Sequence, residues 1–147
     1  MLNFDKHGNL YETQTLSFNE LVVELGHPSN RKLLLDNARI FLKIFKSFGC
    51  TSVYVAGSFV SKDELPEDID LCMDLTHIRY KELKTQYPDF FSEKGISGIR
   101  EKYGVHIVCF FDSFSLELLD WFRKDRNDHA RGLIKVVLND DSIYDKE

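Results

Sequence analysis

The most constraining feature of this chain is an apolar segment that ends in Gly57-Ser58 and is followed, ten residues after the serine, by Asp68 and Asp70. Residues 52–56 read Ser-Val-Tyr-Val-Ala, a run rich in β-branched and aromatic side chains that is typical of a buried strand. A glycine at the end of such a strand lets a ligand approach the backbone closely, and neighbouring N–H groups together with the Ser58 hydroxyl can hold phosphate oxygens. The segment therefore predicts a strand that leads into a phosphate-binding turn.

The two carboxylates belong to a second predicted strand, over residues 68–73. Because side chains alternate along a strand, we expect Asp68 and Asp70 on one face and the residues between and after them in the core. Paired carboxylates are the hard oxygen ligands that Mg²⁺ prefers, completed by waters and substrate phosphates. An acidic surface turn is the alternative interpretation, but the order of strand, Gly-Ser and Asp-x-Asp favours a metal–nucleotide site. Such a site would stabilise in-line displacement at a triphosphate.

The remaining apolar patterns predict helices that alternate with strands. A capping box at residues 17–20 starts a helix that runs to Leu25, and a longer helix opens at residues 28–30 with an apolar stripe and a stop at Gly49. Further helices are expected over residues 76–86 and from Ser113 or Ser115 through residues 121–124, and further strands over residues 105–111 and 132–138. This alternation predicts an α/β (α+β) fold with a mixed central β-sheet flanked by helices. Residues 1–147 are expected to form a single domain, with residues 1–16 as an N-terminal arm or hairpin that turns at residues 7–9.

Charge is distributed unevenly along the chain. The net charge of -5 gives no general attraction to nucleic acid, yet residues 123–135 carry five basic side chains and residues 63–74 are strongly acidic. An acidic cluster facing a basic segment suits a metal together with a phosphate ligand. Two solvated faces of a small domain are the alternative interpretation.

Cysteine spacing and hydropathy indicate in which cellular compartment the protein is expected. The three cysteines show no CxxC spacing, which argues against a disulfide framework or zinc ribbon and indicates a reducing, cytoplasmic compartment. Cys72 and Cys109 lie in apolar runs and are expected to be buried. No stretch approaches eighteen apolar residues, so no membrane span is expected.

The run VYVAGSFVSKDELPEDIDLCMDL, residues 53–75, resembles the motif of the polymerase-beta-like nucleotidyltransferase superfamily, in particular its minimal prokaryotic members. The resemblance extends over most of the chain to a short, largely uncharacterised nucleotidyltransferase-like family, through the stretches FNELVVELGHPSNRKLLLDN, KYGVHIV and WFRKDRNDHARGLIKVVL. It implies Gly57-Ser58 on the triphosphate, Mg²⁺ (or Mn²⁺) on Asp68 and Asp70, and transfer of a nucleotidyl group from an NTP to a hydroxyl on a protein, RNA or small molecule. It also implies a toxin–antitoxin or phage-conflict role, in which a partner supplies the acceptor.

His106 stands where the resemblance leads us to expect a third carboxylate. It has three interpretations: a nitrogen ligand that favours Mn²⁺ or a transition metal, a general base for the acceptor hydroxyl, or a structural histidine in a site that has lost turnover. A lone histidine on a strand is most often structural. The alternative function is therefore a catalytically degenerate fold that senses a nucleotide or binds a partner.

The residues just after Gly57-Ser58, which would compensate the charge of a triphosphate, are the second departure from the family pattern. Minimal members often carry arginines just after Gly-Ser, whereas here Lys62 is the nearby cation. We expect Lys62 or the basic segment at residues 123–135 to compensate the triphosphate, with an exposed loop lysine as the alternative interpretation of Lys62. A nucleic-acid-binding role led by the basic segment is a third hypothesis, which the net charge disfavours.

Overall fold

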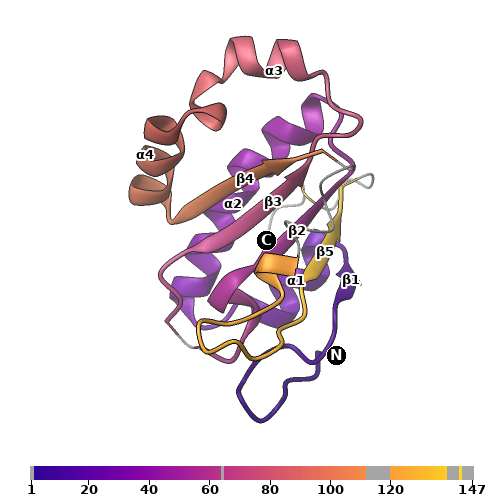
Figure 1. Ribbon diagram of the computed structural model, residues 1–147, viewed down its shortest axis with the longest axis vertical. Helices are drawn as coiled ribbons and strands as arrows, with labels where there is room; N and C mark the ends of the chain where they lie inside the picture. Colours follow the sequence, from indigo (N-terminus) through magenta and orange to yellow (C-terminus); the bar gives the residue numbers. More distant parts are fainter. Residues whose placement is uncertain (1, 64, 112–119, 139–142, 144–147) are drawn as a thin grey trace.

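The computed structural model describes residues 2–63, 65–111, 120–138 and 143, and its centre is a five-stranded mixed sheet in the order β1-β5-β2-β3-β4 (Figure 1). The inner pairs β5–β2 and β2–β3 are antiparallel, while β1–β5 and β3–β4 are parallel. This confirms the predicted mixed sheet. The strands are β1 (Gln14–Leu16), β2 (Ser52–Ala56), β3 (Ile69–Asp74), β4 (Val105–Phe110) and β5 (Ile134–Val137).

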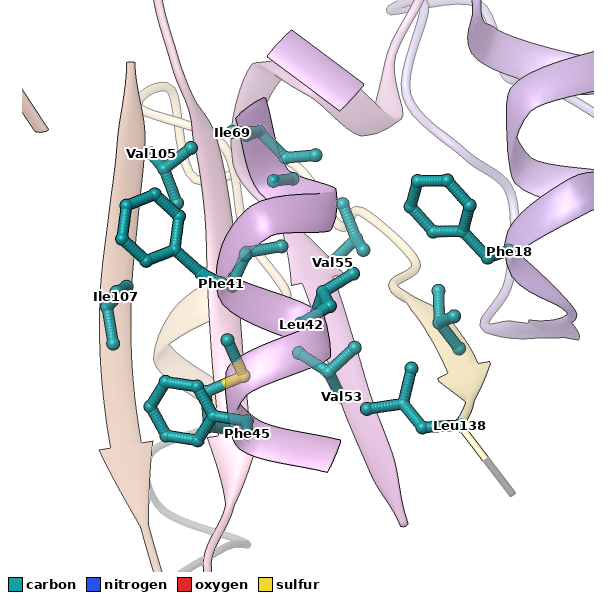
Figure 2. Packing of buried hydrophobic residues seen from close by; sticks show 14 of the residues in the cluster. Phe18, Phe41, Leu42, Phe45, Val53, Val55, Ile69, Val105, Ile107 and Leu138 are labelled. Atoms are coloured by element: carbon teal, nitrogen blue, oxygen red, sulfur yellow. The ribbon is translucent and has the colours of Figure 1, made fainter. Parts of the chain in front are cut away.

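Helices α1 (Phe18–Leu25) and α2 (Ser29–Ser47) cover one face of the sheet, and α2 runs behind the strands in Figure 1. The apolar stripe predicted for α2 is confirmed, because its members are buried in one cluster with the strands. Burial of one such large side chain stabilises the fold by roughly 1.5–3 kcal/mol. Figure 2 shows the centre of this core, where α2 meets the strands through Phe41, Leu42, Phe45, Val53, Ile69, Val105 and Ile107.

The start of α1 is fixed by the predicted capping box. The Ser17 hydroxyl accepts a hydrogen bond from the backbone N–H of Glu20 at 3.1 Å, and the Glu20 carboxylate accepts one from the N–H of Ser17 at 2.9 Å. Two N–H groups that the helix itself leaves unpaired are thereby satisfied. The helix ends before Gly26, as predicted.

The end of α2 is a glycine stop. The N–H of Gly49 donates to the carbonyl of Lys46 and the N–H of Cys50 donates to that of Phe45, each at 3.0 Å. Gly49 has φ +106, the left-handed backbone that this Schellman arrangement requires. The predicted stop is confirmed, with Gly49 one residue beyond the capping residue Phe48.

Helix α3 (Tyr80–Gln86) starts four residues later than predicted. Asp74 Oδ1 accepts hydrogen bonds from the backbone N–H of Thr76 at 3.0 Å and from its hydroxyl at 2.5 Å. These contacts stabilise a turn and compete with a first helical turn, so the predicted start was wrong. The predicted strands 68–73, 105–111 and 132–138 are observed with limits shifted by one or two residues, as β3, β4 and β5.

Helix α4 (Glu93–Tyr103) and the 3₁₀ turn before it (Pro88–Phe91) have no counterpart in the sequence prediction. Internal glycines lower the helix propensity of α4. None of its residues is fully buried, and Ile99 and Tyr103 pack half-buried against the core. Its ends do carry signals. Ser92 Oγ accepts from the N–H of Gly95 at 3.0 Å, and Gly104 closes the helix with φ +69.

The two internal glycines of α4 give a matched pair of expected results. Gly98→Ala should raise the free energy of unfolding by about 0.5–1 kcal/mol, because alanine favours the helix and its Cβ would meet no heavy atom within 4 Å. Gly95→Ala should lower it, because its Cβ would lie 2.4 Å from the backbone of Asp89. Chemical denaturation compares the two variants, and equal effects would contradict this packing of α4.

The opposite face of the sheet carries a smaller buried cluster, against which Phe122 packs. Residues 120–122 are helical and residues 123–124 are not, so the helix ends within the predicted limit of 121–124. Its predicted start at Ser113 or Ser115, up to position 119, lies outside the described residues. Asp70 and His106 belong to this face because they alternate with core-facing neighbours on β3 and β4. The cluster consists of Ala56, Cys72, Phe110 and Leu133.

A tight turn closes the N-terminal residues before β1. Asp5 Oδ1 accepts from the N–H groups of His7 and Asn9 at 2.8 and 3.1 Å, and an antiparallel bridge joins Phe4 to Leu10. We call residues 4–10 the N-terminal turn. Across the described residues, none of the helices has the length and apolarity that a membrane crossing requires.

Candidate functional site

The backbone of Gly57 lies directly against the Asp70 carboxylate. Gly57 follows β2 and begins a 3₁₀ turn (Gly57–Val60) with φ +80, a conformation that favours glycine. A Cβ at this position would lie 2.6 Å from Asp70 Oδ2. The structure therefore brings together two parts of the predicted motif that the sequence separates.

His106 stands opposite Asp70 in the β3–β4 ladder. Its Nδ1 lies 3.2 Å from Asp70 Oδ1, and the two side chains are 27% and 15% exposed. The pair is thus partly shielded yet reachable by a ligand. When Nδ1 carries the proton toward Asp70, Nε2 is the nitrogen that can accept a proton or bind a metal.

Asp68 has a different partner. Both Nε and Nη2 of Arg100, from α4, lie 2.7 Å from Asp68 Oδ2. The Arg100 side chain is 52% exposed and the Asp68 side chain 19% exposed, so the arginine covers the carboxylate from the solvent side. Each carboxylate of the predicted pair is therefore engaged by a basic side chain of its own.

The donor chemistry of these residues fits a hard divalent cation. Mg²⁺ is usually held by one or two carboxylates together with waters and substrate phosphates, so Asp68 and Asp70 are the residues that would hold it. Among the described residues, no group of three or more His, Cys, Asp or Glu side chains is arranged to hold a metal. Substrate phosphates would accordingly have to complete the ligand set, and Arg100 would have to release Asp68.

A hollow of about 510 Å³ opens beside Ser58, and we call it the Ser58 hollow. Ser58 is half-buried, and within the described part of the chain its hydroxyl has no hydrogen-bond partner. The basic side chains Lys62, Arg126 and Arg131 line the hollow, with two acids, Asp63 and Asp125, among the other lining residues. A free hydroxyl and three cations around one hollow form a surface suited to an anion.

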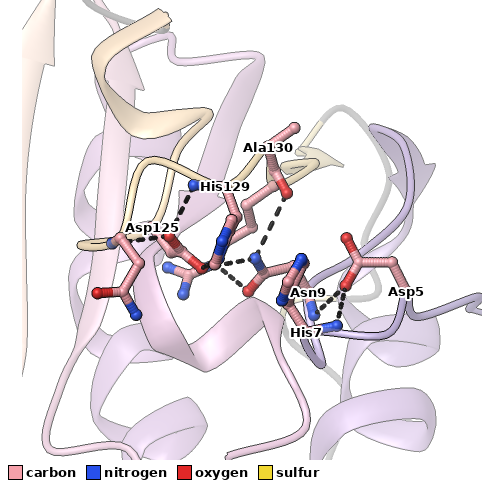
Figure 3. A network of polar contacts seen from close by, with 8 residues as sticks. Asp5, His7, Asn9, Asp125, His129 and Ala130 are labelled. Atoms are coloured by element: carbon pink, nitrogen blue, oxygen red, sulfur yellow. Dashed lines mark hydrogen bonds and ion pairs between the residues drawn. The ribbon is translucent and has the colours of Figure 1, made fainter.

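Residues of the N-terminal turn and of a loop at residues 124–131 line this hollow. Figure 3 shows the polar contacts that join the two segments. The buried Asn9 joins them: its Nδ2 donates to Asp125 Oδ2 at 2.9 Å, and its Oδ1 accepts from Arg131 Nε at 3.0 Å. The turn is attached to the chain after Ser58 as well, because the N–H of Lys62 donates to the carbonyl of Gly8 at 2.8 Å. Asn9 thereby fixes where Arg131 lies.

Asp125 is the centre of the loop. Hydrogen bonds from Asn9 and from the backbone N–H groups of His129 and Asn127 hold the pKa of its carboxyl well below the ordinary value. The His129 ring lies 3.3 Å from Asp125 and stacks on the ring of His7 with centroids 3.6 Å apart. Asp125 is therefore a structural anion whose hydrogen-bonding capacity is used by the loop itself.

Arg131 connects the Ser58 hollow to the carboxylates electrostatically. Burial lowers the pKa of its guanidinium, while the charges of Asp125, Asp70 and Asp5 raise it and that of Arg126 lowers it further. An arginine keeps its charge despite such shifts. The charges of Asp70 and Arg126 thus both act on this guanidinium.

Arg31, on α2, holds the chain that follows Ser58. Its guanidinium donates to the carbonyls of Phe59 at 2.7 Å, Ser61 at 2.8 Å and Asp63 at 3.0 Å. Only 3% of the residue is exposed, and burial lowers the pKa of its guanidinium. Within the described residues no carboxylate forms an ion pair with it. Its hydrogen bonds go to backbone carbonyls, while the nearby Asp63 charge raises its pKa and the Phe59 ring lies 4.8 Å from the guanidinium.

The structure brings most of the predicted site residues together. Gly57, Asp70 and His106 are in contact, and Ser58 and Lys62 line one hollow beside them. Asp68 is the exception, because among the described residues its side chain pairs with Arg100 of α4. The basic segment at residues 123–135 contributes two of its five basic residues to the Ser58 hollow, Arg126 and Arg131.

Sequence reasoning missed three polar residues of the site region. Arg31 carries a local signal, since it interrupts the apolar stripe of α2 one turn before Leu34 and is a charge on a buried face. Asn9 and Arg100 carry no local signal, because each forms its hydrogen bond with a residue far away along the chain.

The cysteines take no part in the chemistry of the site. All three are free, as predicted. Burial raises the pKa of the Cys50 and Cys109 thiols to about 12, and burial with the nearby Asp70 charge raises that of Cys72 as well. Cys72 is buried as expected, whereas Cys109 is only half-buried. Thiols with raised pKa values are poor nucleophiles near neutral pH.

Comparison with known proteins gives one match. No curated protein and no solved structure matches the chain. The model of a family of unknown function (DUF6932) matches residues 2–137. That range is most of the 147 residues, so the chain belongs to this family.

Proposed function

We propose that this protein binds a nucleoside triphosphate and transfers its nucleotidyl group to an acceptor hydroxyl. The observation that carries the proposal is the juxtaposition of the Ser58 hollow, with its three basic side chains, and the Asp70 carboxylate that lies against Gly57. Anion-binding groups next to solvent-reachable carboxylates are the arrangement that a metal–triphosphate substrate requires. The resemblance of residues 53–75 to the nucleotidyltransferase motif supports the same reaction.

The triphosphate would be bound by Ser58, Lys62, Arg126 and Arg131. The Ser58 hydroxyl would donate to a phosphate oxygen, and the planar guanidinium groups suit the geometry of phosphate. Asn9 holds Arg131 in place before substrate arrives, so less side-chain conformational entropy is lost on binding.

Asp68 and Asp70 would hold Mg²⁺, or Mn²⁺ if the nitrogen of His106 takes part. A bound cation of this kind neutralises phosphate charge and polarises the phosphoryl oxygens. Arg100 is exposed and on the solvent side of Asp68, so it can leave the carboxylate and contact the triphosphate instead.

His106 is the candidate general base. With Nδ1 hydrogen-bonded to Asp70, the Nε2 atom would take the proton of the acceptor hydroxyl. The acceptor oxygen then forms a bond to the α-phosphorus as the bond from that phosphorus to the pyrophosphate oxygen breaks. The products are the nucleotidylated acceptor, pyrophosphate and one proton.

The acceptor class and the setting of the reaction extend this proposal. A protein, an RNA end or a small molecule would supply the hydroxyl, and a toxin–antitoxin or phage-conflict setting follows from the resemblance alone. The free cysteines support a reducing, cytoplasmic location.

Calorimetry with NTPs tests the binding step. We expect binding that strengthens at least about tenfold, or ~1.4 kcal/mol, when Mg²⁺ or Mn²⁺ is added, and we expect Asp68→Asn with Asp70→Asn to remove this gain. Asp36→Asn is the matched control, because Asp36 forms a surface pair with Lys32 on α2, where both side chains are about half exposed. Absence of binding to any NTP, with or without metal, would rule out the proposed function.

The position of a radioactive label tests the transfer step. An NTP labelled at the α-phosphate should leave its label on the acceptor, whereas one labelled at the γ-phosphate should not. Purified protein with candidate acceptor proteins or RNA provides the assay, and His106→Gln should lower the rate while leaving NTP binding in place. Transfer of the γ-label would identify a kinase-type reaction and contradict the proposal.

A second candidate function is a nucleotide sensor without turnover. It is favoured by the contacts that both carboxylates already make. Arg100 forms an ion pair with Asp68 and His106 forms a hydrogen bond with Asp70, so these side chains occupy oxygens that a metal would need. NTP binding that is independent of metal, together with no transfer of the α-label, would favour the sensor over the enzyme.

A further inference from the structure

Trp121 exposes its ring at the edge of a second hollow. The residue is 78% exposed, although indole is a side chain that gains strongly from burial. The hollow has a volume of about 620 Å³, and we call it the Trp121 hollow. The described residues that line it are Asp120, Trp121, Lys124, Asp125, Arg126 and Asp128.

The Trp121 hollow adjoins the Ser58 hollow. Asp125 and Arg126 line both, so the two share a wall. A ligand whose anionic end contacts Arg126 therefore lies against a residue that also lines the Trp121 hollow.

The acidic side chains of the Trp121 hollow already have partners within the protein. Asp120 pairs with Arg123 at 3.1 Å and Asp128 with Lys124 at 3.5 Å, while Asp125 accepts hydrogen bonds from within its own loop. Arg126, by contrast, has no ion-pair partner among the described residues. The groups left for a ligand are a guanidinium charge and a flat aromatic face.

We propose that the Trp121 hollow binds the base of the nucleoside triphosphate whose phosphates occupy the Ser58 hollow. The inference rests on the proposed function and names the second half of the substrate's site. A nucleotide combines an anion and a flat π-face in one small molecule, which matches a cation and an indole in adjoining hollows. Because every base has a π-face, stacking on Trp121 gives little choice between bases, with purines ahead of pyrimidines.

Fluorescence gives a direct readout, because Trp121 is the only tryptophan of the chain. ATP or GTP should quench its emission in a saturable manner. Inorganic triphosphate, which has no base, should compete for binding without quenching. Trp121→Ala should weaken ATP binding about 10- to 100-fold and leave triphosphate binding unchanged, and Trp121→Phe should restore most of the loss.

Tyr11→Ala is the matched control, since Tyr11 is another highly exposed aromatic residue (73%) and lines neither hollow. ATP binding in calorimetry without quenching, and unchanged in Trp121→Ala, would overturn the base subsite and leave the proposed function standing. Binding of neither ATP nor triphosphate would overturn both. Quenching by single-stranded RNA but not by mononucleotides would also overturn the inference and assign the hollow to an acceptor.

Discussion

Arg31→Met should lower the free energy of unfolding by about 3–5 kcal/mol, the range for removal of one partner from a buried charged network. Methionine keeps the aliphatic packing but leaves the carbonyls of Phe59, Ser61 and Asp63 without their donor. A buried polar group left unpaired costs about 1–3 kcal/mol. Urea denaturation measures the difference.

Arg79→Met is the control for the loss of an arginine. Arg79 also donates to a backbone carbonyl, that of Ser47, and pairs with Glu82, but its side chain is 55% exposed. Exposed pairs of this kind contribute about 0–1 kcal/mol, so this variant should be nearly as stable as the parent. A similarly small loss for Arg31→Met would mean that water replaces the guanidinium at the three carbonyls.

Arg31 also links stability to the site. The carbonyls that it binds belong to the chain between Ser58 and Lys62 or directly after it, so the guanidinium fixes the wall of the Ser58 hollow from the core side. A charge buried on the core-facing side of a helix lowers the stability of the fold unless hydrogen bonds satisfy it, as they do here. Under the proposed function, the same variant should weaken triphosphate binding in proportion to the loosening of this wall.

The parts of the fold that the sequence predicts correctly are those set by local signals. Strand β2 was predicted with its observed limits because its β-branched run is bounded by turn residues. The capping box at Ser17 and the stop at Gly49 involve residues at most five positions apart. Helix α4 escaped prediction because its internal glycines hide the periodicity that identifies helices.

The parts that the sequence does not predict are made by contacts between distant residues. Asn9 and Asp125 are 116 positions apart, and Asp68 and Arg100 are 32 apart. Nothing in the local pattern of either residue specifies its partner, since the sheet topology decides which segments meet. The resemblance of residues 53–75 to a known motif predicts that the Gly57-Ser58 turn and Asp70 share one site, and the basic segment at residues 123–135 was expected near the phosphates. Which of its residues line the Ser58 hollow could not be predicted.

The charge balance of the site separates the two candidate functions. Basic side chains now hold both carboxylates, Arg100 on Asp68 and His106 on Asp70. A metal–triphosphate substrate brings positive charge to the carboxylates and negative charge to the cations at the same time. Its arrival can therefore replace the Arg100–Asp68 ion pair and the hydrogen bond of His106 with new contacts at little electrostatic cost, whereas a metal-independent ligand would leave them in place.

Under the proposed function, Gly57→Ala should reduce the rate of nucleotidyl transfer about 100-fold, the loss that a displacement of about 1 Å at a reacting group can cause. An alanine at φ +80 is strained, and its Cβ would meet Asp70 Oδ2 at 2.6 Å, so either the turn or the carboxylate must move. NTP affinity should fall with the rate, because the same backbone borders the phosphate-binding turn. Label transfer from an α-labelled NTP and calorimetry measure the two effects.

Gly49→Ala separates this effect from general strain. Gly49 has φ +106 and its Cβ would lie 2.7 Å from the carbonyl oxygen of His77, yet it precedes β2, at the end of the strand away from Gly57. It should therefore destabilise the fold while the folded protein keeps its NTP affinity. Gly57→Asn is a second variant, since asparagine tolerates the left-handed backbone but still places a Cβ against Asp70. If both Gly57 variants fold and bind NTP as the parent does, NTP binding does not depend on close packing of this glycine against the Asp70 carboxylate.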